Sequence, residues 1–354
     1  MTLLLLVGSR CPEWRIDYRK QLLLRVLGSP YQLVTLIVAA GDPLAAVAAQ
    51  HQIPVQFLLP ELNQPRRKVQ AALGDPAFQM RLSAWLQLLR QRAPDLGICF
   101  YGDWLPPALF ELPSHGFLNF HPGPLPALKG MEPDTFAILE GRASTHGTVH
   151  LITEKFDEGA IVAITPELPL RQCMTPPQVF RALTQLGVTT LMHTITAFAA
   201  GNVVYQPQDL TQATVATRQR ARLEAYLDFQ HDDAVMIDRR RRAFLSQDIG
   251  IRLKAKIKQQ VYEVLDVETW LGHFGGTLGE WRGDYRGTGL FAGAPMMRIS
   301  NGIAIVRLGY PIDSKMMSAP PPQPEVRFDR SRPSLTSLHL VRQSLEDILD
   351  ASLA

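Results

Sequence analysis

The chain has 354 residues, of which 46% are hydrophobic and 19% charged, and its net charge is +3. This length suggests two or three domains. The net charge is too small to indicate nucleic-acid binding by itself. Three widely spaced cysteines, Cys11, Cys99 and Cys173, are typical of a reducing compartment and predict neither a disulfide framework nor a zinc cluster.

The first residues, MTLLLLVGSRCPEW, contain an apolar run of strand length with no basic residue before it. This pattern predicts a β-strand and not a signal peptide. No apolar stretch approaches the roughly 20 residues that a membrane-spanning helix needs. We therefore expect a cytoplasmic protein that has no membrane partner.

Residues 1–205 alternate short apolar runs with longer amphipathic ones. The predicted strands are Leu3–Val7, Leu33–Ala39, Gly97–Tyr101, Phe117–Phe120, Thr148–Ile152 and Ala160–Ile164. The predicted helices lie near 15–27, 43–51, 77–92, 133–141 and 176–200. Such alternation is typical of βαβ units, so we predict an α/β fold whose mainly parallel, Rossmann-like sheet carries helices on both faces.

The composition changes near residue 206, where a polar stretch predicts a linker over 206–222. A short helix containing DDAVMIDRRRRAF follows, and then come short apolar runs separated by glycine-rich turns. The runs predict strands at Ile251–Ile257, Val261–Val267, Thr277–Trp281, Met297–Ile299 and Gly302–Leu308. We expect a small β-rich, OB-like or barrel-like C-terminal domain over 223–315, then a proline-rich tail and a terminal helix over 316–354.

The most informative stretch is FLNFHPGPLPALKG, residues 117–130. Asn119 and His121 are two positions apart, so on a strand their side chains face the same side and can converge on one ligand atom. Ligands of parallel sheets bind beyond the carboxyl ends of strands, which is where both residues fall. Glycines in the following loop permit close approach of the backbone to a ligand, and its prolines limit the freedom of the loop.

A second polar element follows in STHGTVHLITEKFDEGAIV, which predicts a strand and then a turn that contains Asp157. A carboxylate in this turn can reach an imidazole on a neighbouring strand. Each residue alone has an ordinary interpretation: His121 as a satisfied structural group, Asn119 as the brace of a turn, and Asp157 as part of a turn. Their occurrence together, in this order and beside this loop, favours a catalytic site.

Residues 97–164 resemble the catalytic core of the folate-dependent formyltransferases, a family that includes the methionyl-tRNA and sugar N-formyltransferases. The matching residues are Tyr101-Gly102, Asn119-Phe120-His121-Pro122, Leu125-Pro126, Lys129-Gly130, Pro133, Ala137-Ile138, Thr148-Val149-His150 and Asp157-Glu158-Gly159. The resemblance in fold extends over about 1–205 and implies a catalytic domain there. The sequence departs from the family at Gly123-Pro124, and this HPGP is similar to the formyltransferase-like module of a hydrogenase-maturation protein.

The resemblance implies transfer of a formyl group from 10-formyltetrahydrofolate to a primary amine, with no metal. In this mechanism Asn119 and a protonated His121 donate to the formyl oxygen as charge develops on it, while Asp157 orients His121 and assists a proton relay. The implied cofactor-binding residues are Cys99, Tyr101, Gly102, Leu105 and Phe156. Those expected to shape the substrate-binding side are Gly123, Pro124, Leu125 and Lys129.

The acceptor amine is open at this point. The stretch VAAGDPLAAVAAQHQIPV after the second predicted strand contains no Lys or Arg, which disfavours tRNA and favours a small molecule such as an amino sugar or an amino-acid derivative. The basic run Arg239–Arg242 argues for a phosphate-bearing partner, although it also fits a solvated helix face. The alternatives are a methionyl-tRNA formyltransferase, a formyltetrahydrofolate hydrolase and a non-catalytic folate-binding protein.

Overall fold

The computed structural model describes residues 1–7, 16–100, 104–245, 250–257, 260–273, 277–284, 286 and 290–312. Contacts divide the chain into one compact unit, Met1–Pro311, and a second unit, Ile312–Ala354. The architecture below concerns the first unit. The predicted tail and terminal helix, residues 316–354, lie outside the described residues.

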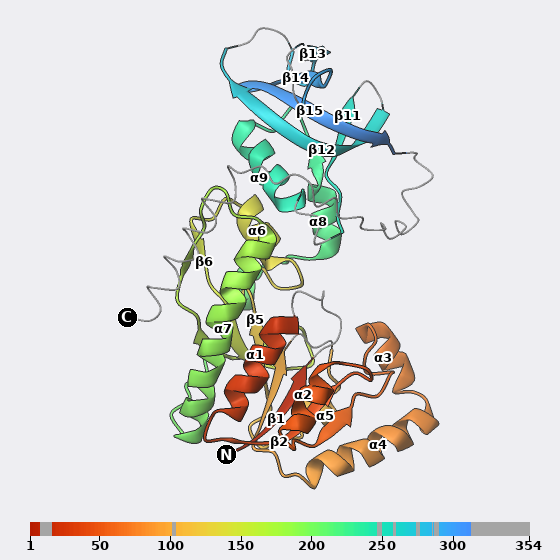
Figure 1. The fold of residues 1–354 in the computed structure, drawn as a ribbon, viewed down its shortest axis with the longest axis vertical. Helices are drawn as coiled ribbons and strands as arrows, with labels where there is room; N and C mark the ends of the chain where they lie inside the picture. The colour runs from red at the N-terminus through yellow and green to blue at the C-terminus, as the bar shows by residue number, and fades with distance from the viewer. Residues whose placement is uncertain are drawn as a thin grey trace. The chain divides into compact units, whose positions relative to one another are not determined.

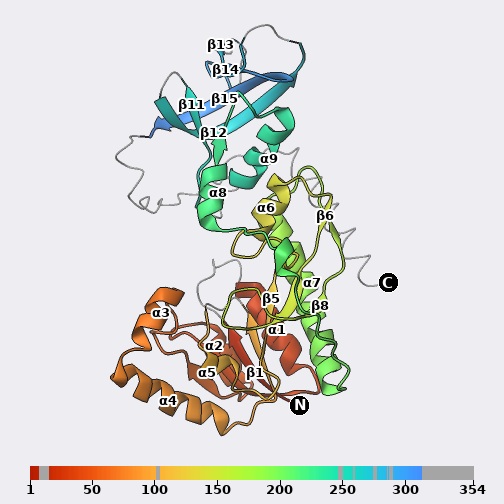
Figure 2. The same ribbon diagram turned by 180° about the vertical axis from the view of Figure 1, so that it is seen from behind.

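A seven-stranded sheet forms the centre of the first part of the chain, in the order β3-β2-β1-β4-β5-β7-β8 (Figures 1 and 2). Its strands are β1 (Thr2–Val7), β2 (Gln32–Val38), β3 (Val55–Phe57), β4 (Leu96–Phe100), β5 (Phe117–His121), β7 (Thr148–Leu151) and β8 (Ile161–Ile164). The pairs from β3 through to β5 are parallel, and β7 pairs antiparallel with both β5 and β8. The predicted mainly parallel, Rossmann-like sheet is confirmed.

Helices cover both faces of this sheet because alternate residues of its strands point to opposite sides. In β1, Leu3 and Leu5 belong to one buried cluster, whereas Leu4 and Leu6 belong to another. The first cluster includes residues of α1 (Ile16–Leu27), α2 (Leu44–Gln50), α6 (Pro133–Leu139) and α7 (Pro176–Ala199). The second includes residues of α3 (Arg66–Ala72), α4 (Pro76–Arg90) and α5 (Pro107–Phe110). Even the 24-residue α7 is not apolar enough to span a bilayer, and neither is any other helix in the described ranges.

Several short elements have no counterpart in the prediction: β3, α3, α5 and the two-stranded pair β6 (Ser144–Thr145) and β9 (Leu168–Pro169). Each has seven residues or fewer, which is too short for a clear periodic pattern. A buried ion pair fixes the connection between β2 and α2. There Asp42 accepts a hydrogen bond from Arg19 of α1 at 2.7 Å, and both side chains are 2% exposed.

The later part of the unit contains the 3₁₀ helix η2 (Leu210–Gln212), α8 (Arg218–Glu224), α9 (Ala234–Phe244) and a six-stranded sheet. The sheet order is β10-β11-β12-β15-β14-β13, with β10 (Tyr226–Leu227), β11 (Lys254–Ile257), β12 (Gln260–Leu271), β13 (Trp281–Asp284), β14 (Pro295–Ile299) and β15 (Gly302–Pro311). The predicted β-rich region is confirmed. The strand predicted at Thr277–Trp281 is wrong, because Thr277 and Glu280 close a turn and the strand begins at Trp281.

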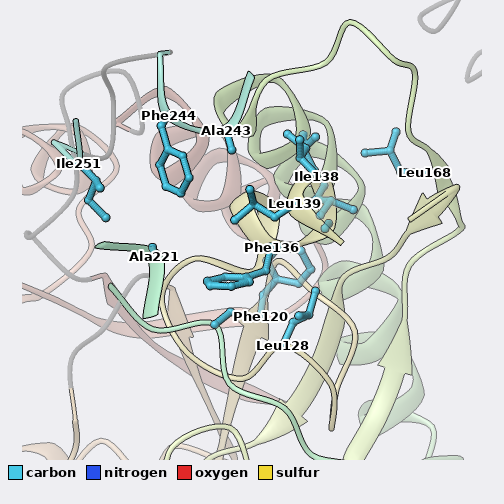
Figure 3. Packing of buried hydrophobic residues seen from close by; sticks show 14 of the residues in the cluster. Phe120, Leu128, Phe136, Ile138, Leu139, Leu168, Ala221, Ala243, Phe244 and Ile251 are labelled. Carbon is cyan, nitrogen blue, oxygen red and sulfur yellow. The ribbon is translucent and has the colours of Figure 1, made fainter. Parts of the chain in front are cut away.

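One apolar cluster continues from the first sheet into the later elements. Phe120 of β5 packs in the same cluster as Leu128, Phe136 of α6, Ala221 of α8 and Phe244 of α9 (Figure 3). All five are at most 4% exposed. The loop that follows Asn119 and His121 is therefore anchored in the core through Leu128.

Candidate active site

Asn119 and His150 lie opposite one another because β5 and β7 pair antiparallel in a register that aligns them. Asn119 Nδ2 is 3.2 Å from His150 Nε2. The other ring nitrogen of His150, Nδ1, is 2.8 Å from the Leu151 carbonyl oxygen, which only accepts. His150 therefore carries its proton on Nδ1, and its Nε2 accepts one of the two amide hydrogens of Asn119.

Burial of His150 keeps its imidazole neutral. The side chain is 3% exposed, and burial lowers the pKa of His150 below its ordinary value of 6.5. The nearby Asp157 carboxylate opposes this effect, and His121 adds to it. A neutral ring is the form that can accept from Asn119, so the electrostatics and the hydrogen-bond geometry agree.

His121 closes the end of β5 and is 3% exposed. Its Nε2 is 3.0 Å from the Leu128 carbonyl oxygen, so this nitrogen is the donor of that pair. Its Nδ1 is 3.7 Å from Asp157 Oδ2, and the other carboxylate oxygen, Oδ1, is 3.7 Å from His150 Nε2. Of the residues predicted as catalytic, His121 and Asp157 thus face each other, and Asn119 is connected to the Asp157 carboxylate through His150.

Asp157 adopts a left-handed backbone conformation, with φ of +58°. Its Oδ2 accepts a hydrogen bond from the Gly130 amide at 2.9 Å. Gly130 itself has φ of +111° and passes so close to Ala216 that an added Cβ would lie 2.9 Å from that residue's carbonyl oxygen. Only glycine fits there, which explains the predicted importance of the loop glycine in terms of the chain's own packing.

The residues predicted to shape the substrate side form a tightly packed loop. An added Cβ at Gly123 would lie 2.5 Å from Pro133 Cβ and 3.1 Å from His121 Nε2, so the backbone passes directly against the His121 ring. Pro124 and Leu125 are buried. Lys129 Nζ lies 2.5 Å from Glu158 Oε1, and this bond is the main reason why the pKa of Glu158 is lowered.

The residues predicted to bind the cofactor fall into three groups. Cys99 and Leu105 are each 2% exposed and belong to the buried cluster beneath the site. Phe156 is 51% exposed and is available to a ligand. Tyr101 and Gly102 lie outside the described residues.

The exposed backbone of 153–156 can bind a flat, polar ring. Trp104 Nε1 donates to the Glu154 carbonyl at 2.8 Å, and Thr153 donates to the Lys155 carbonyl, which fixes the loop. Within the described part of the chain, the amides of Glu154, Lys155 and Phe156 have no hydrogen-bond acceptor. Several backbone donors beside one apolar side chain are a typical arrangement for a heterocyclic ligand.

The sequence prediction missed some residues that touch this constellation. His150 stands in the Thr148-Val149-His150 match, and pairing of the two strands could have identified it. Leu128 contributes through its carbonyl, which no side-chain pattern reveals. Gln208 and Thr214 come from the segment predicted as a linker, and both bind loops of the site.

Sequence comparison relates the chain to a known class of protein. A family model described as formyl transferase matches residues 33–195. Methionyl-tRNA formyltransferase of Chloroflexus aggregans is 34% identical over 229 residues, which span 62% of this chain and 72% of that protein.

Solved structures show the same fold at low identity. The N-formyltransferase of Helicobacter canadensis, solved with folinic acid and dTDP-3-aminofucose, has a TM-score of 0.56 at 14% identity, covering 87% of this chain and 99% of its own. HypX of Aquifex aeolicus, solved with tetrahydrofolic acid, has a TM-score of 0.51 at 16% identity, covering 86% of this chain and 43% of its own. The relative that is 34% identical, 72% of which the match covers, shows that the chain belongs to the folate-dependent formyltransferase family of enzymes.

Proposed function

We propose that this enzyme transfers a formyl group from 10-formyltetrahydrofolate to the primary amine of a small molecule. The observation that carries the proposal is the convergence of Asn119, His121 and Asp157. A continuous series of contacts links Asn119 to His150, His150 to Asp157, and Asp157 to His121. An amide, an imidazole and a carboxylate so arranged suit acyl transfer without a covalent protein intermediate.

Asn119 supplies the oxyanion donor. His150 accepts one hydrogen of its amide group, which fixes the orientation of the amide and leaves the second N–H for a formyl oxygen. As the amine nitrogen bonds to the formyl carbon, negative charge develops on this oxygen and strengthens the hydrogen bond. The tetrahedral intermediate then collapses with cleavage of the bond from the formyl carbon to N10 of the folate.

His121 and Asp157 supply the proton chemistry. The attacking amine must lose one proton, and N10 of the departing folate gains one, so no net proton change is required of the protein. Asp157 Oδ2 and His121 Nδ1 face each other at 3.7 Å, so a small approach of the two groups would bring them within hydrogen-bond reach for proton transfer. Donation from His121 Nε2 to the formyl oxygen requires this nitrogen to share or leave its bond to the Leu128 carbonyl.

The formyl donor fits the loop beside Asp157. The backbone amides of 154–156 and the exposed Phe156 are suited to the polar edge and the flat face of a pterin. Folate derivatives are present in both neighbour structures described above, which supports this class of donor. The donor's N10-formyl group would then lie toward Asp157 and Asn119.

Two observations favour a small acceptor over tRNA. The connection between β2 and α2 contains no basic residue, and it is held against α1 by the buried Asp42–Arg19 pair. Furthermore, acidic partners within the chain neutralise much of the basic run on α9. Arg240 pairs with Glu224 and Asp232, and both Arg241 and Arg242 pair with Asp238.

Initiator methionyl-tRNA is the second candidate acceptor, because the relative that is 34% identical is a methionyl-tRNA formyltransferase. The two acceptors differ in their response to salt. Binding of tRNA weakens steeply as monovalent salt rises from about 50 mM to about 200 mM, whereas a small amine responds weakly. We expect transfer that is nearly insensitive to salt over this range.

The deciding experiment incubates the protein with 10-formyltetrahydrofolate and a panel of amines that includes nucleotide-linked amino sugars, amino acids and charged tRNA. Mass spectrometry should find one small amine that gains about 28 Da, as expected for acyl transfer. Formylation of methionyl-tRNA alone would reject the small acceptor. Release of formate without any formylated amine would identify a hydrolase instead, and binding of folate without turnover would identify a non-catalytic protein.

A further inference from the structure

The segment 206–218 crosses both loops that carry the site, and we refer to it as the strap. It begins with paired backbone hydrogen bonds of 2.8 Å between Gln206 and Ile161 of the edge strand β8. Farther along, Val215 forms a parallel bridge with Lys129 in the loop after β5, through backbone hydrogen bonds made by Thr214 and Ala216. The strap therefore runs from the Asp157 side of the site to the Leu128 side.

Two strained backbone positions flank the ring of His121. Leu128 has φ of +55° and Asp157 has φ of +58°, and both values are unfavourable for residues with side chains, above all for leucine. The Leu128 carbonyl is the partner of His121 Nε2, and the Asp157 carboxylate faces Nδ1. Strained positions of this kind persist only where surrounding contacts hold them.

The strap binds both strained residues. Leu128 donates its backbone N–H to Thr214 Oγ1 at 3.0 Å, and Lys129 next to it donates to the Thr214 carbonyl at 2.9 Å. On the other side, Gln208 Nε2 donates to the carbonyl oxygens of Asp157 and Gly159 at 3.0 and 2.7 Å. One side-chain bond from the strap therefore reaches each of the two residues beside His121.

Further contacts fix the register of the strap against the loop that follows β5. Ala216 donates to the Lys129 carbonyl at 2.6 Å and accepts from the Glu132 amide at 2.9 Å. Arg218 pairs with the buried Glu132 carboxylate at 3.2 Å. Leu128 itself packs with Phe120 and Phe136, so its side chain is anchored while the strap holds its amide (Figure 3).

We propose that Gln208 and Thr214 are positioning residues, which hold Asp157 and the Leu128 carbonyl in the geometry that His121 requires. This inference rests on the proposed transfer reaction but concerns residues outside the reacting groups. The strap acts on the orientation and proton chemistry of the imidazole. Its loss should therefore lower kcat much more than it raises the KM for the formyl donor.

Thr214 offers a closely matched set of variants. Thr214→Val removes the acceptor of the Leu128 amide at nearly constant shape, and Thr214→Ser restores the hydroxyl. Thr211→Val is the control, because Thr211 is an exposed strap threonine whose side chain bonds only Asp209 among the described residues. We expect Thr214→Val to lose about tenfold in kcat, with Thr214→Ser and Thr211→Val near wild type.

Gln208 tests the other end of the strap. Its Oε1 is buried without a hydrogen-bond partner in the described part of the chain. Gln208→Met removes both donated bonds and leaves the Asp157 and Gly159 carbonyls without this donor, so kcat is measured below the unfolding transition of the variant. We expect kcat to fall about tenfold while the KM for the donor changes less than about threefold.

NMR of the His121 ring nitrogens tests the positioning role by a measurement that does not depend on turnover. In protein labelled with ¹⁵N-histidine, long-range ¹H–¹⁵N spectra report the protonated nitrogen of His121, identified by its loss in His121→Asn. We expect a single Nε2-protonated pattern in wild type and in Thr211→Val. In Thr214→Val and Gln208→Met, we expect a mixture of tautomers.

The two readouts separate the inference from the proposed function. Unchanged kcat in both strap variants of an active enzyme would overturn the positioning role, whatever their stability. If the wild-type protein transfers no formyl group, the proposed function fails. The His121 spectra alone then decide whether Gln208 and Thr214 position the imidazole. An unchanged His121 pattern in both variants then rejects the inference, and a changed pattern supports it.

Discussion

In the proposed mechanism Asn119 serves the reacting carbonyl, because His150 uses only one of its two amide hydrogens. The neutral state of His150 follows from burial, which lowers its pKa, and from the bond between Nδ1 and the Leu151 carbonyl. His121 is the last residue of β5, and Asp157 lies in the turn between β7 and β8. At the scale of single residues, the site consists of two donors, one acceptor ring and one carboxylate.

Replacing Asn119 with alanine should remove the oxyanion donor. We expect kcat to fall about 10²- to 10³-fold, since one such donor is worth that much in other acyl-transfer enzymes. Circular dichroism should be unchanged. Asn202→Ala is the control, because Asn202 is exposed and its side chain makes no bond to the site. A kcat within about twofold of wild type in Asn119→Ala would contradict the assigned role.

His150 should make stability depend on pH. Its folded-state pKa lies below the ordinary 6.5, so the unfolded chain binds a proton that the folded chain does not. By linkage, its contribution to stability is present above 6.5 and is lost as the pH falls below that value. His150→Gln cannot titrate, so its urea midpoint should fall less than that of wild type between about pH 7.5 and about pH 5.5. Parallel losses in the two proteins would contradict this expectation.

At the scale of elements, the antiparallel pairing of β5 with β7 and the loop after β5 determine the geometry. The pairing aligns Asn119 with His150. The loop turns back so sharply that Gly123 contacts both Pro133 and His121. A stiff loop thus limits the movement of the ring, while the strap holds the loop from outside.

Substitution of Gly123 with alanine should therefore destabilise the fold. Its added Cβ would lie 2.5 Å from Pro133 Cβ, and such overpacking costs about 1–3 kcal/mol of unfolding free energy. Gly28→Ala is the matched control, because an added Cβ there meets its nearest atom at 3.4 Å. Urea denaturation measures both. Equal stability of the two variants would show that the loop can relax.

At the scale of the whole molecule, most arginines of the basic run on α9 pair with or pack against other parts of the chain. Arg240 lies between Glu224 and Asp232, Arg242 donates to the Met174 carbonyl, and Arg239 packs against Gly141. Burial raises the pKa of Asp232, and Arg240 partly opposes this effect. The cluster thus joins α9 to its surroundings, which favours the structural interpretation of these arginines.

Arg240→Met should destabilise the protein by about 3–5 kcal/mol, because it leaves the buried Asp232 carboxylate without its ionic partner. The Asp232 side chain is 6% exposed and that of Arg240 is 14% exposed. Arg222→Met on the exposed side of α8 is the control. Chemical denaturation should show the difference, and kcat for a small amine below the unfolding transition should remain near wild type. A selective loss of tRNA binding with unchanged stability would instead favour the nucleic-acid interpretation.

The sequence by itself determined the alternation of strands and helices, because apolar periodicity follows from which faces must be buried. It also singled out Asn119, His121 and Asp157 as candidates, because rare polar residues at strand ends stand out against apolar runs, and their catalytic roles stay predictions. Only the tertiary structure decided which atoms meet. Strand register placed His150 beside Asn119, backbone strain turned the Leu128 carbonyl toward His121, and the strap reached the site through bonds to backbone atoms. Backbone contacts of this kind depend on conformation and not on side-chain identity, so no residue pattern encodes them.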